Sequence, residues 1–409
     1  MPRGLEDAIA QKLAIASALR ADRSLQNWTI TETARPEVRE WHCGPYRLSF
    51  GYQRADLVVR GPSIYPHLDA RRNHLVEETI YTGSGMSALA ALVTALLATR
   101  GTIEVVGTEE GYAETRELLE RFRDRVRCVP LRPAQRSRAV ASADPAAARV
   151  VWLDSAVPSS FAHRMRVAPH ACDLVVVDTT CFWRDSGRIR RVLRWARERD
   201  VALALVRSHA KLDCLGIEYG RIGSIVLAWR RSAEHAWMRE LSSEARSAVR
   251  LLGCAAVPAH FPPFVADRDY AACSAARTAS IIRNTRRLAR RLRASPLGAG
   301  VTAFQHGLYL TVAPRGELRI RDVRRAVDAL CEALASEELP VRHAGSFGFD
   351  FVALEWFPDP RTRRNLVRIA PGDVPLAIID RVADGIVRWF QSQSAGAAPG
   401  PPESARTSR

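Results

Sequence analysis

The sequence predicts an α/β protein, with a mainly parallel sheet covered by helices on both faces and a smaller α+β domain after it. From Thr79 to Trp229, short apolar runs alternate with helical patterns, as where TIEVVGT (102–108) precedes an amphipathic segment (112–125). The apolar runs are continuous rather than alternating with polar residues. Continuous runs are typical of parallel strands that are buried on both faces.

The first 50 residues are expected to form an N-terminal arm, with one helix at 5–21 followed by a polar stretch. A large domain is expected at 51–245. Its elements begin with a turn and an apolar helix at 81–98. Strands are predicted at 102–108, 126–131, 148–154, 173–178, 201–206 and 223–229, and further helices at 112–125 and 189–200. In such sheets, ligands bind at the carboxyl ends of the strands.

A smaller domain is expected at 246–392, where long helices and a Pro-rich patch replace the regular alternation. Helices are predicted at 267–294, 321–335 and 375–391, and a strand at 307–314. The segments SFGFDFVALEW (346–356) and NLVRIAPG (365–372) lie between the last two helices. The last segment, 393–409, is rich in Ser, Pro, Gly and Ala, and we expect it to be disordered.

The chain of 409 residues carries a formal net charge of +16 at pH 7. A nucleic-acid or membrane-surface partner is one explanation, and a bias toward GC-rich codons, which favours Arg and Ala, is the other. The arginines are scattered, and no DNA-binding motif or stripe of aromatic and basic residues is recognisable. We therefore favour composition bias, together with attraction of anionic small molecules, over a polyanion partner.

The eight cysteines are dispersed without a CxxC pair, so neither a metal site nor a disulfide framework is indicated. The amino terminus has no apolar core of signal-peptide length. No segment approaches the ~20 apolar residues that cross a bilayer. We expect a cytoplasmic protein with reduced thiols and no membrane partner.

Lys211 is one of only two lysines, the other being Lys12, and the remaining 58 of the 60 basic residues are arginines. An amine can lose its proton and form a Schiff base with an aldehyde, whereas a guanidinium cannot. The retention of lysine directly after an apolar strand therefore favours covalent chemistry at this position.

Two other features lie at strand ends. TGSGMS opens a helix, and a small, Gly-containing turn at a helix N-terminus presents free backbone N–H groups to an anion such as a phosphate. Asp178 closes the strand DLVVVD, where a carboxylate can keep a pyridine nitrogen protonated. A phosphate site, a Schiff-base lysine and a buried aspartate are together what pyridoxal 5'-phosphate requires.

The motifs resemble those of fold-type-I pyridoxal-phosphate enzymes, and specifically the family of cysteine and methionine metabolism that contains cystathionine synthases and lyases. GSGMSAL resembles the family's SGM turn, which implies that the N–H groups of Gly85 and Met86 hold the phosphate. VVVDTT gives Asp178 the role of pyridinium partner. SHAK implies that Lys211 forms the Schiff base and that Ser208 is a phosphate ligand. The resemblance implies a large domain with a mainly parallel, seven-stranded sheet.

Further residues follow from the same resemblance. GYAETRELL implies that Tyr112 stacks on the pyridine ring. GYQR resembles the motif whose side chains reach the phosphate of a neighbouring subunit, which suggests Tyr52 and Arg54, with Tyr65 in SIYPH as a competing candidate. The active sites would then be shared in a homodimer, or in a homotetramer built from dimers.

SFG, followed by NLVRIAPGD, resembles two substrate-binding segments of the family. This implies that Ser346 contacts the substrate and that Arg368 clamps its α-carboxylate, a bidentate role for which arginine is suited.

The resemblance implies an enzyme that activates an amino acid through an external aldimine and a quinonoid. The expected reaction is γ-elimination or γ-replacement. A C–C or C–S bond could be formed, and an anionic co-substrate could take part. An aminotransferase is the alternative, because it shares Lys211, Asp178 and an arginine clamp. The family's residues are replaced by Thr179, Ala210 and the segment DSAVPSS, which indicates a divergent member, as in biosynthesis of a specialised metabolite.

Three neighbouring residues are expected to be structural. His209 lies beside the lysine and could stack or move protons, but we favour a buried histidine with satisfied hydrogen bonds. Cys181 and Cys214 are interpreted as small packing residues rather than nucleophiles.

One alternative function belongs to a different class from the enzymes. The chain would then be a coenzyme-bound protein without catalytic activity, or a nucleic-acid binder.

Overall fold

The structure is a computed structural model. It describes residues 4–30, 39–43, 46–51, 57–63, 75–131, 147–157, 172–183, 186–232, 235–265, 267–313, 320–358 and 365–396. The chain divides into two units. The first comprises Met1–Ala279 and Phe304–His306, and the second comprises Ser280–Ala303 and Gly307–Arg409.

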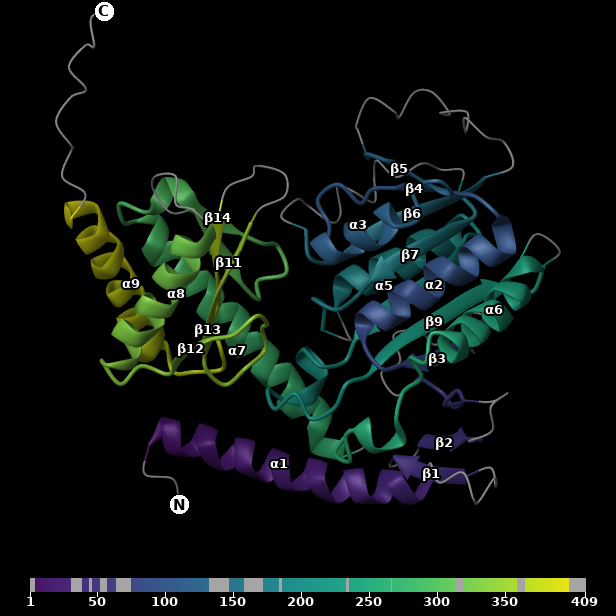
Figure 1. Cartoon of the computed structure of the whole chain (residues 1–409), viewed down its shortest axis with the longest axis horizontal. Helices are drawn as coiled ribbons and strands as arrows, with labels where there is room; N and C mark the ends of the chain where they lie inside the picture. The colour runs from purple at the N-terminus through teal and green to yellow at the C-terminus, as the bar shows by residue number, and fades with distance from the viewer. Residues whose placement is uncertain are drawn as a thin grey trace, which may run out of the picture. The chain divides into compact units, whose positions relative to one another are not determined.

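A seven-stranded sheet with the order β3-β9-β8-β7-β6-β4-β5 forms the centre of the first unit (Figure 1). β9 is antiparallel to β3 and β8, and the other adjacent pairs are parallel. The strands are β3 (Leu75–Thr82), β4 (Ile103–Val106), β5 (Val126–Val129), β6 (Ala148–Asp154), β7 (Leu174–Asp178), β8 (Ala202–Ser208) and β9 (Gly223–Arg230). The predicted, mainly parallel sheet is confirmed.

The central strands β6, β7 and β8 are buried on both faces, which explains their continuous apolar runs. Successive side chains of a strand point to opposite faces. In β6, Val150 packs in one hydrophobic cluster and Val151 in another, and in β7 the same holds for Val176 and Val177.

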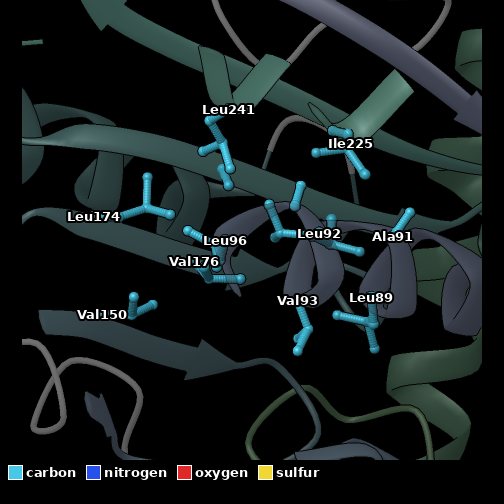
Figure 2. Close-up of a cluster of buried hydrophobic side chains, with 14 of the residues drawn as sticks. Leu89, Ala91, Leu92, Val93, Leu96, Val150, Leu174, Val176, Ile225 and Leu241 are labelled. Atoms are coloured by element: carbon cyan, nitrogen blue, oxygen red, sulfur yellow. The ribbon is translucent and has the colours of Figure 1, made fainter. Parts of the chain in front are cut away.

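Helices cover the two faces of the sheet. α2 (Gly85–Arg100) and α6 (Trp237–Leu251) pack on one face, and α5 (Gly187–Glu198) covers the other. Figure 2 shows the apolar side chains of α2 among those of strands β6, β7 and β9 and of Leu241 in α6. α3 (Ala113–Glu120) adds the buried Leu119 to the same cluster as α2.

The N-terminal arm contains more regular structure than the sequence predicts. Its helix α1 runs over Leu5–Ile30, beyond the expected end at residue 21, and an antiparallel hairpin follows with β1 (Arg39–Cys43) and β2 (Tyr46–Phe50). Ala16 and Leu19 of α1 pack against Cys214, Ile217 and Tyr219. The helix therefore covers the segment that follows Lys211.

The second unit contains a five-stranded sheet with the order β10-β11-β14-β13-β12, in which the β12–β13 pair is parallel and the others are antiparallel. The strands are β10 (Val301–Ala303), β11 (Leu310–Val312), β12 (Val341–His343), β13 (Val352–Pro358) and β14 (Asn365–Ala370). The helices are α8 (Ile320–Ala335) and α9 (Leu376–Gly396), and the second half of α7 (Arg268–Arg293) also belongs to this unit.

The units meet inside α7, after Ala279, whereas the sequence predicted a boundary at 245–246. The physical reason is that α6 and the start of α7 pack in the first unit, where Tyr270 Oη donates to the backbone oxygen of Asp213 at 2.8 Å. In the second half of α7, Asn284 Nδ2 donates to the oxygens of Gly372 and Val374. At the other end of the chain, α9 continues to Gly396, so the predicted tail from 393 is helical at its start, and 397–409 lie outside the described residues.

Candidate active site

The parallel strands β6, β7 and β8 end together at one edge of the sheet, and their last residues are Asp154, Asp178 and Ser208. Asp154 is paired in register with Asp178. On the other side of β7, Asp178 is paired with Val206, two residues before Ser208. The edge is the one at which α/β proteins bind ligands, so the structure brings Asp178 and Ser208 to the place where the sequence predicted a site.

The turn before α2 lies against the end of β8. Ser84 caps the helix, because its Oγ accepts the N–H of Ser87 at 3.0 Å. A Cβ on Gly85 would lie 2.8 Å from Ser208 Cβ, so only glycine allows this approach. Gly85, Met86 and Ser208, which the sequence assigned to one phosphate, are therefore neighbours at the N-terminus of a 16-residue helix, where backbone N–H groups are available to an anion.

Asp178 is buried beside a second carboxylate. Its Oδ1 accepts the N–H of Thr180 at 2.7 Å, and Thr180 Oγ1 in turn accepts the N–H of Ser208 at 3.0 Å. Burial, and then the negative charge of Asp154, raise the pKa of Asp178 to about 7. A buried carboxyl group with such a pKa has a high affinity for a proton or for a cationic N–H group.

Asp154 connects this edge to Tyr112, at the start of α3. Its Oδ2 accepts the backbone N–H of Tyr112 at 2.7 Å, and its Oδ1 accepts the N–H of Ala156 at 2.7 Å. The Tyr112 side chain is 40% exposed, so its ring is accessible for stacking. Sequence reasoning missed Asp154, although it closes an apolar strand in the same way as Asp178.

Lys211 lies on a bend three residues after Ser208 and directly before a short 3-10 helix, η2 (Leu212–Cys214). Leu215, the residue directly after η2, adopts the left-handed conformation with φ 49°. Lys12 Nζ in α1 donates to the backbone oxygen of Leu215 at 2.5 Å. Both lysines of the chain thus adjoin η2: Lys211 directly precedes it, and Lys12 of α1 contacts the residue that directly follows it.

The residues around Lys211 that were expected to be structural are deeply buried. His209 Nε2 lies 2.8 Å from Ser224 Oγ, and its Nδ1 lies 2.9 Å from Asp213 Oδ2. Cys181 is buried, and burial raises the pKa of Cys214 to about 12. A thiol with so high a pKa is a poor nucleophile, which supports a packing role for Cys214.

In the second unit, Arg368 forms an ion pair with Glu355, its neighbour in the β13–β14 register. The guanidinium carbon lies 5.3 Å from the ring centre of Tyr309, and this ring contacts Phe347, the residue after Ser346. The predicted substrate residues Arg368 and Ser346 are therefore close to each other. Glu355 is an acidic neighbour that the sequence did not reveal.

Tyr52, Arg54 and the competing Tyr65 lie outside the described residues, so their roles stay predictions. Within the described ranges, no group of three or more His, Cys, Asp or Glu side chains is placed to hold a metal ion. None of the helices in the described part of the chain combines the length and apolar character needed to cross a membrane.

No family model and no curated protein matches the sequence. Solved structures do match its fold. CalE6, a methionine gamma lyase from Micromonospora echinospora, in its apo form, is 20% identical, with 77% of this chain and 81% of that chain covered and a TM-score of 0.52. Cystathionine gamma synthase from Xanthomonas oryzae pv. oryzae in complex with cystathionine is 16% identical, with 77% and 82% covered and a TM-score of 0.55. The chain has the fold of these proteins, as the sequence predicted.

Proposed function

We propose that the chain is a pyridoxal-phosphate-dependent enzyme that acts on an amino acid by γ-elimination or γ-replacement. The observation that carries the proposal is one line of contacts at the edge of the sheet. It runs from the turn that begins α2 (the α2 turn) through Ser208 and Thr180 to Asp178. Lys211 lies on the segment that follows β8, the strand that ends at Ser208. The similar structures are named as a gamma lyase and a gamma synthase, which supports reaction at the γ-carbon.

The residues present fit this coenzyme in charge and in shape. The α2 turn and Ser208 would hold the phosphate, and Gly85 leaves room for the close approach of the two segments. Asp178, with its pKa raised by burial and by Asp154, matches a pyridine nitrogen that carries a proton. Tyr112, fixed through its backbone by Asp154, would stack on the ring.

When bound, pyridoxal phosphate would supply an electron sink for negative charge at the substrate α-carbon. Lys211 Nζ would hold the coenzyme and would accept the α-proton of the substrate as a general base. A second proton removed at the β-carbon would allow a leaving group on the γ-carbon to depart. Asp178 would accept a hydrogen bond from the protonated ring nitrogen, and Arg368 would bind the substrate carboxylate.

The finer assignments are part of the same proposal. The departures Thr179 and Ala210 adjoin Asp178 and Lys211, which favours a substrate from specialised metabolism. The net charge of +16 would favour an anionic co-substrate. We further propose a homodimer or homotetramer in the cytoplasm. An aminotransferase is the second candidate, because the same residues would also support formation of a keto acid.

The test is to add pyridoxal phosphate to the purified protein, record the visible absorption of the lysine-bound coenzyme, and supply amino acids with different γ-substituents. We expect the band to form and the leaving group to be released. A keto acid that keeps its γ-substituent, formed together with pyridoxamine phosphate and without release of the leaving group, would instead identify the aminotransferase. Lys211→Arg keeps the positive charge but cannot form the Schiff base, and Lys12→Arg is its matched control. Formation of the band in Lys211→Arg, or its absence in the wild type, refutes the proposal.

A further inference from the structure

Arg207 carries a buried guanidinium at the end of β8, in a strand that is otherwise apolar up to this residue. Only 2% of the surface of Arg207 is exposed. Nε donates to Asp213 Oδ2 at 2.6 Å and Nη2 to Asp213 Oδ1 at 2.7 Å, so the two side chains form a bidentate pair. Burial opposes ionisation of Asp213, but the charge and hydrogen bonds of Arg207 lower its pKa, and the pair is charged at neutral pH.

The third nitrogen of Arg207 binds the turn that follows Asp178. Nη1 donates to the backbone oxygens of Thr179, at 2.5 Å, and Phe182, at 2.8 Å. One guanidinium therefore joins two segments that leave neighbouring strands. One segment carries Asp178, and the other carries Lys211.

Asp213 also accepts a hydrogen bond from His209. Burial lowers the pKa of His209 despite the nearby carboxylate, so the ring is neutral. A carboxylate only accepts, so Nδ1 carries the ring proton and donates to Asp213 at 2.9 Å, while Nε2 accepts from Ser224 Oγ at 2.8 Å. Asp213 is thereby held directly by Arg207, the second-last residue of β8, and through His209 by Ser224 of β9.

Lys211 lies midway between His209 and Asp213, and both of these residues are also held through their backbones, by the residue before β9 and by α7. The backbone N–H of His209 donates to Ile222 at 2.9 Å, and the backbone oxygen of Asp213 accepts from Tyr270 Oη at 2.8 Å. The bend that presents Lys211 is thus anchored two residues before and two residues after the lysine.

We infer that Arg207 and Asp213 are positioning residues that set Lys211 relative to Asp178. The inference rests on the proposed function, in which these two groups bind opposite parts of one coenzyme. A buried ion pair contributes little net stability compared with apolar residues of similar size, but its geometry is restrictive. The pair acts through the backbone of the two segments.

The same cluster contains the hydrogen-bond order of a Ser–His–Asp triad, which in other proteins produces a nucleophilic serine. Here the exposed fractions are 3% for Ser224, 3% for His209 and 1% for Asp213. The serine hydroxyl is closed to a substrate, so the cluster is assigned to positioning and not to hydrolysis.

The experiment replaces the whole pair, because Asp213→Asn alone would leave a buried, unpaired arginine. In Arg207→Met/Asp213→Leu, both charges disappear together. We expect this variant to fold, to bind pyridoxal phosphate at least about tenfold more weakly, and to shift the pH midpoint of the lysine-bound absorption band, because the lysine is misplaced. The matched control is Glu104→Leu/Arg149→Met, which removes an ion pair of 2.9 Å near the N-terminal ends of β4 and β6, away from the edge where Asp178 and Ser208 lie. We expect wild-type affinity and midpoint in the control.

Arg207→Lys is the second variant, and it is decisive if the double variant does not fold. It keeps the charge but loses the fork that reaches Asp213, Thr179 and Phe182 at once. Wild-type coenzyme affinity and pH midpoint in either folded variant overturn the inference. Failure of the proposed function is seen separately, as a wild-type protein that forms no lysine-bound band.

Discussion

Asp154 Oδ2 accepts the backbone N–H of Tyr112 at 2.7 Å, and this bond attaches the start of α3 to the end of β6. Asp154 is also the register neighbour of Asp178. One buried carboxylate therefore fixes the residue proposed to stack on the coenzyme ring and raises the proton affinity of the residue proposed to bind the ring nitrogen.

Gly111→Ala tests how closely these segments approach. A Cβ at this position would lie 2.7 Å from Asp154 Oδ2 and 3.3 Å from Asp154 Cβ. We expect the clash to move Tyr112 and to lower the free energy of unfolding by about 1–3 kcal/mol, with weaker coenzyme binding. Urea unfolding and a coenzyme titration measure both effects. Gly187→Ala, where nothing lies within 4 Å, is the control and is expected to leave both unchanged. If Gly111→Ala unfolds and binds the coenzyme like the wild type, the close approach of Gly111 to Asp154 is not needed.

Asp178→Asn tests the raised pKa of Asp178 in the coenzyme-free protein. A carboxyl group whose pKa is higher in the folded than in the unfolded state stabilises the fold fully below its ordinary pKa of 3.8. This contribution is lost as the pH rises through about 7. We expect the free energy of unfolding of the wild type to fall, relative to that of Asp178→Asn, between about pH 4 and pH 7.

Urea unfolding at several pH values measures this difference. Asp154→Asn provides the companion variant, because removing the neighbouring negative charge lowers the pKa of Asp178. Its pH dependence should therefore be weaker than that of the wild type. Parallel curves for wild type and Asp178→Asn would contradict the prediction.

Lys12→Ala tests the contact between the N-terminal arm and the lysine segment. The variant leaves the backbone oxygen of Leu215 without the ammonium that it accepts from at 2.5 Å. We expect a loss of about 1.5–3 kcal/mol in unfolding free energy, the range for a hydrogen bond to a charged group, together with weaker coenzyme binding. Arg20→Ala, on the same helix and bonded to Ser17 at 3.2 Å on the surface, is the control. If Lys12→Ala changes the unfolding free energy and coenzyme binding no more than Arg20→Ala does, the N-terminal arm does not support this segment.

Glu355→Gln tests the proposed carboxylate clamp in the second unit. Glu355 forms an ion pair with Arg368 and thereby offsets the positive charge that a substrate carboxylate would meet. We expect the KM for the amino acid to fall about fivefold, which corresponds to about 1 kcal/mol, with little change in kcat. Glu337→Gln, which releases Arg388 from its ion pair of 2.7 Å, should leave KM unchanged. A higher KM in Glu355→Gln would mean that Glu355 orients Arg368 instead.

The large sheet could be predicted because its central strands are buried on both faces and therefore consist of continuous apolar runs, as in β7. Asp178 and Lys211 could be singled out because polar residues just after such runs lie at the ligand-binding edge, and Ser208 was implied by the resemblance of SHAK to the family motif. The α2 turn was recognisable from small residues before an apolar helix. These signals are local in sequence, and they do not depend on which side chains meet.

Other features depend on tertiary contacts, and the sequence did not reveal them. Arg207 looked like one more arginine among 58, and its pairing with Asp213 arises only when the segment after β8 folds back. The β1–β2 hairpin has polar residues in both strands, so it resembled an irregular stretch. The boundary between the units lies inside α7, where a continuous helix leaves no change in composition.

The placement of the two lysines has a practical chemical consequence. A reagent that joins an aldehyde irreversibly to an amine has only two side chains to attack in this chain. One of them, Lys12, is half-buried, and its ammonium donates a hydrogen bond to the carbonyl oxygen of Leu215. Borohydride fixation followed by peptide mass measurement can therefore assign the attachment point from a single modified fragment.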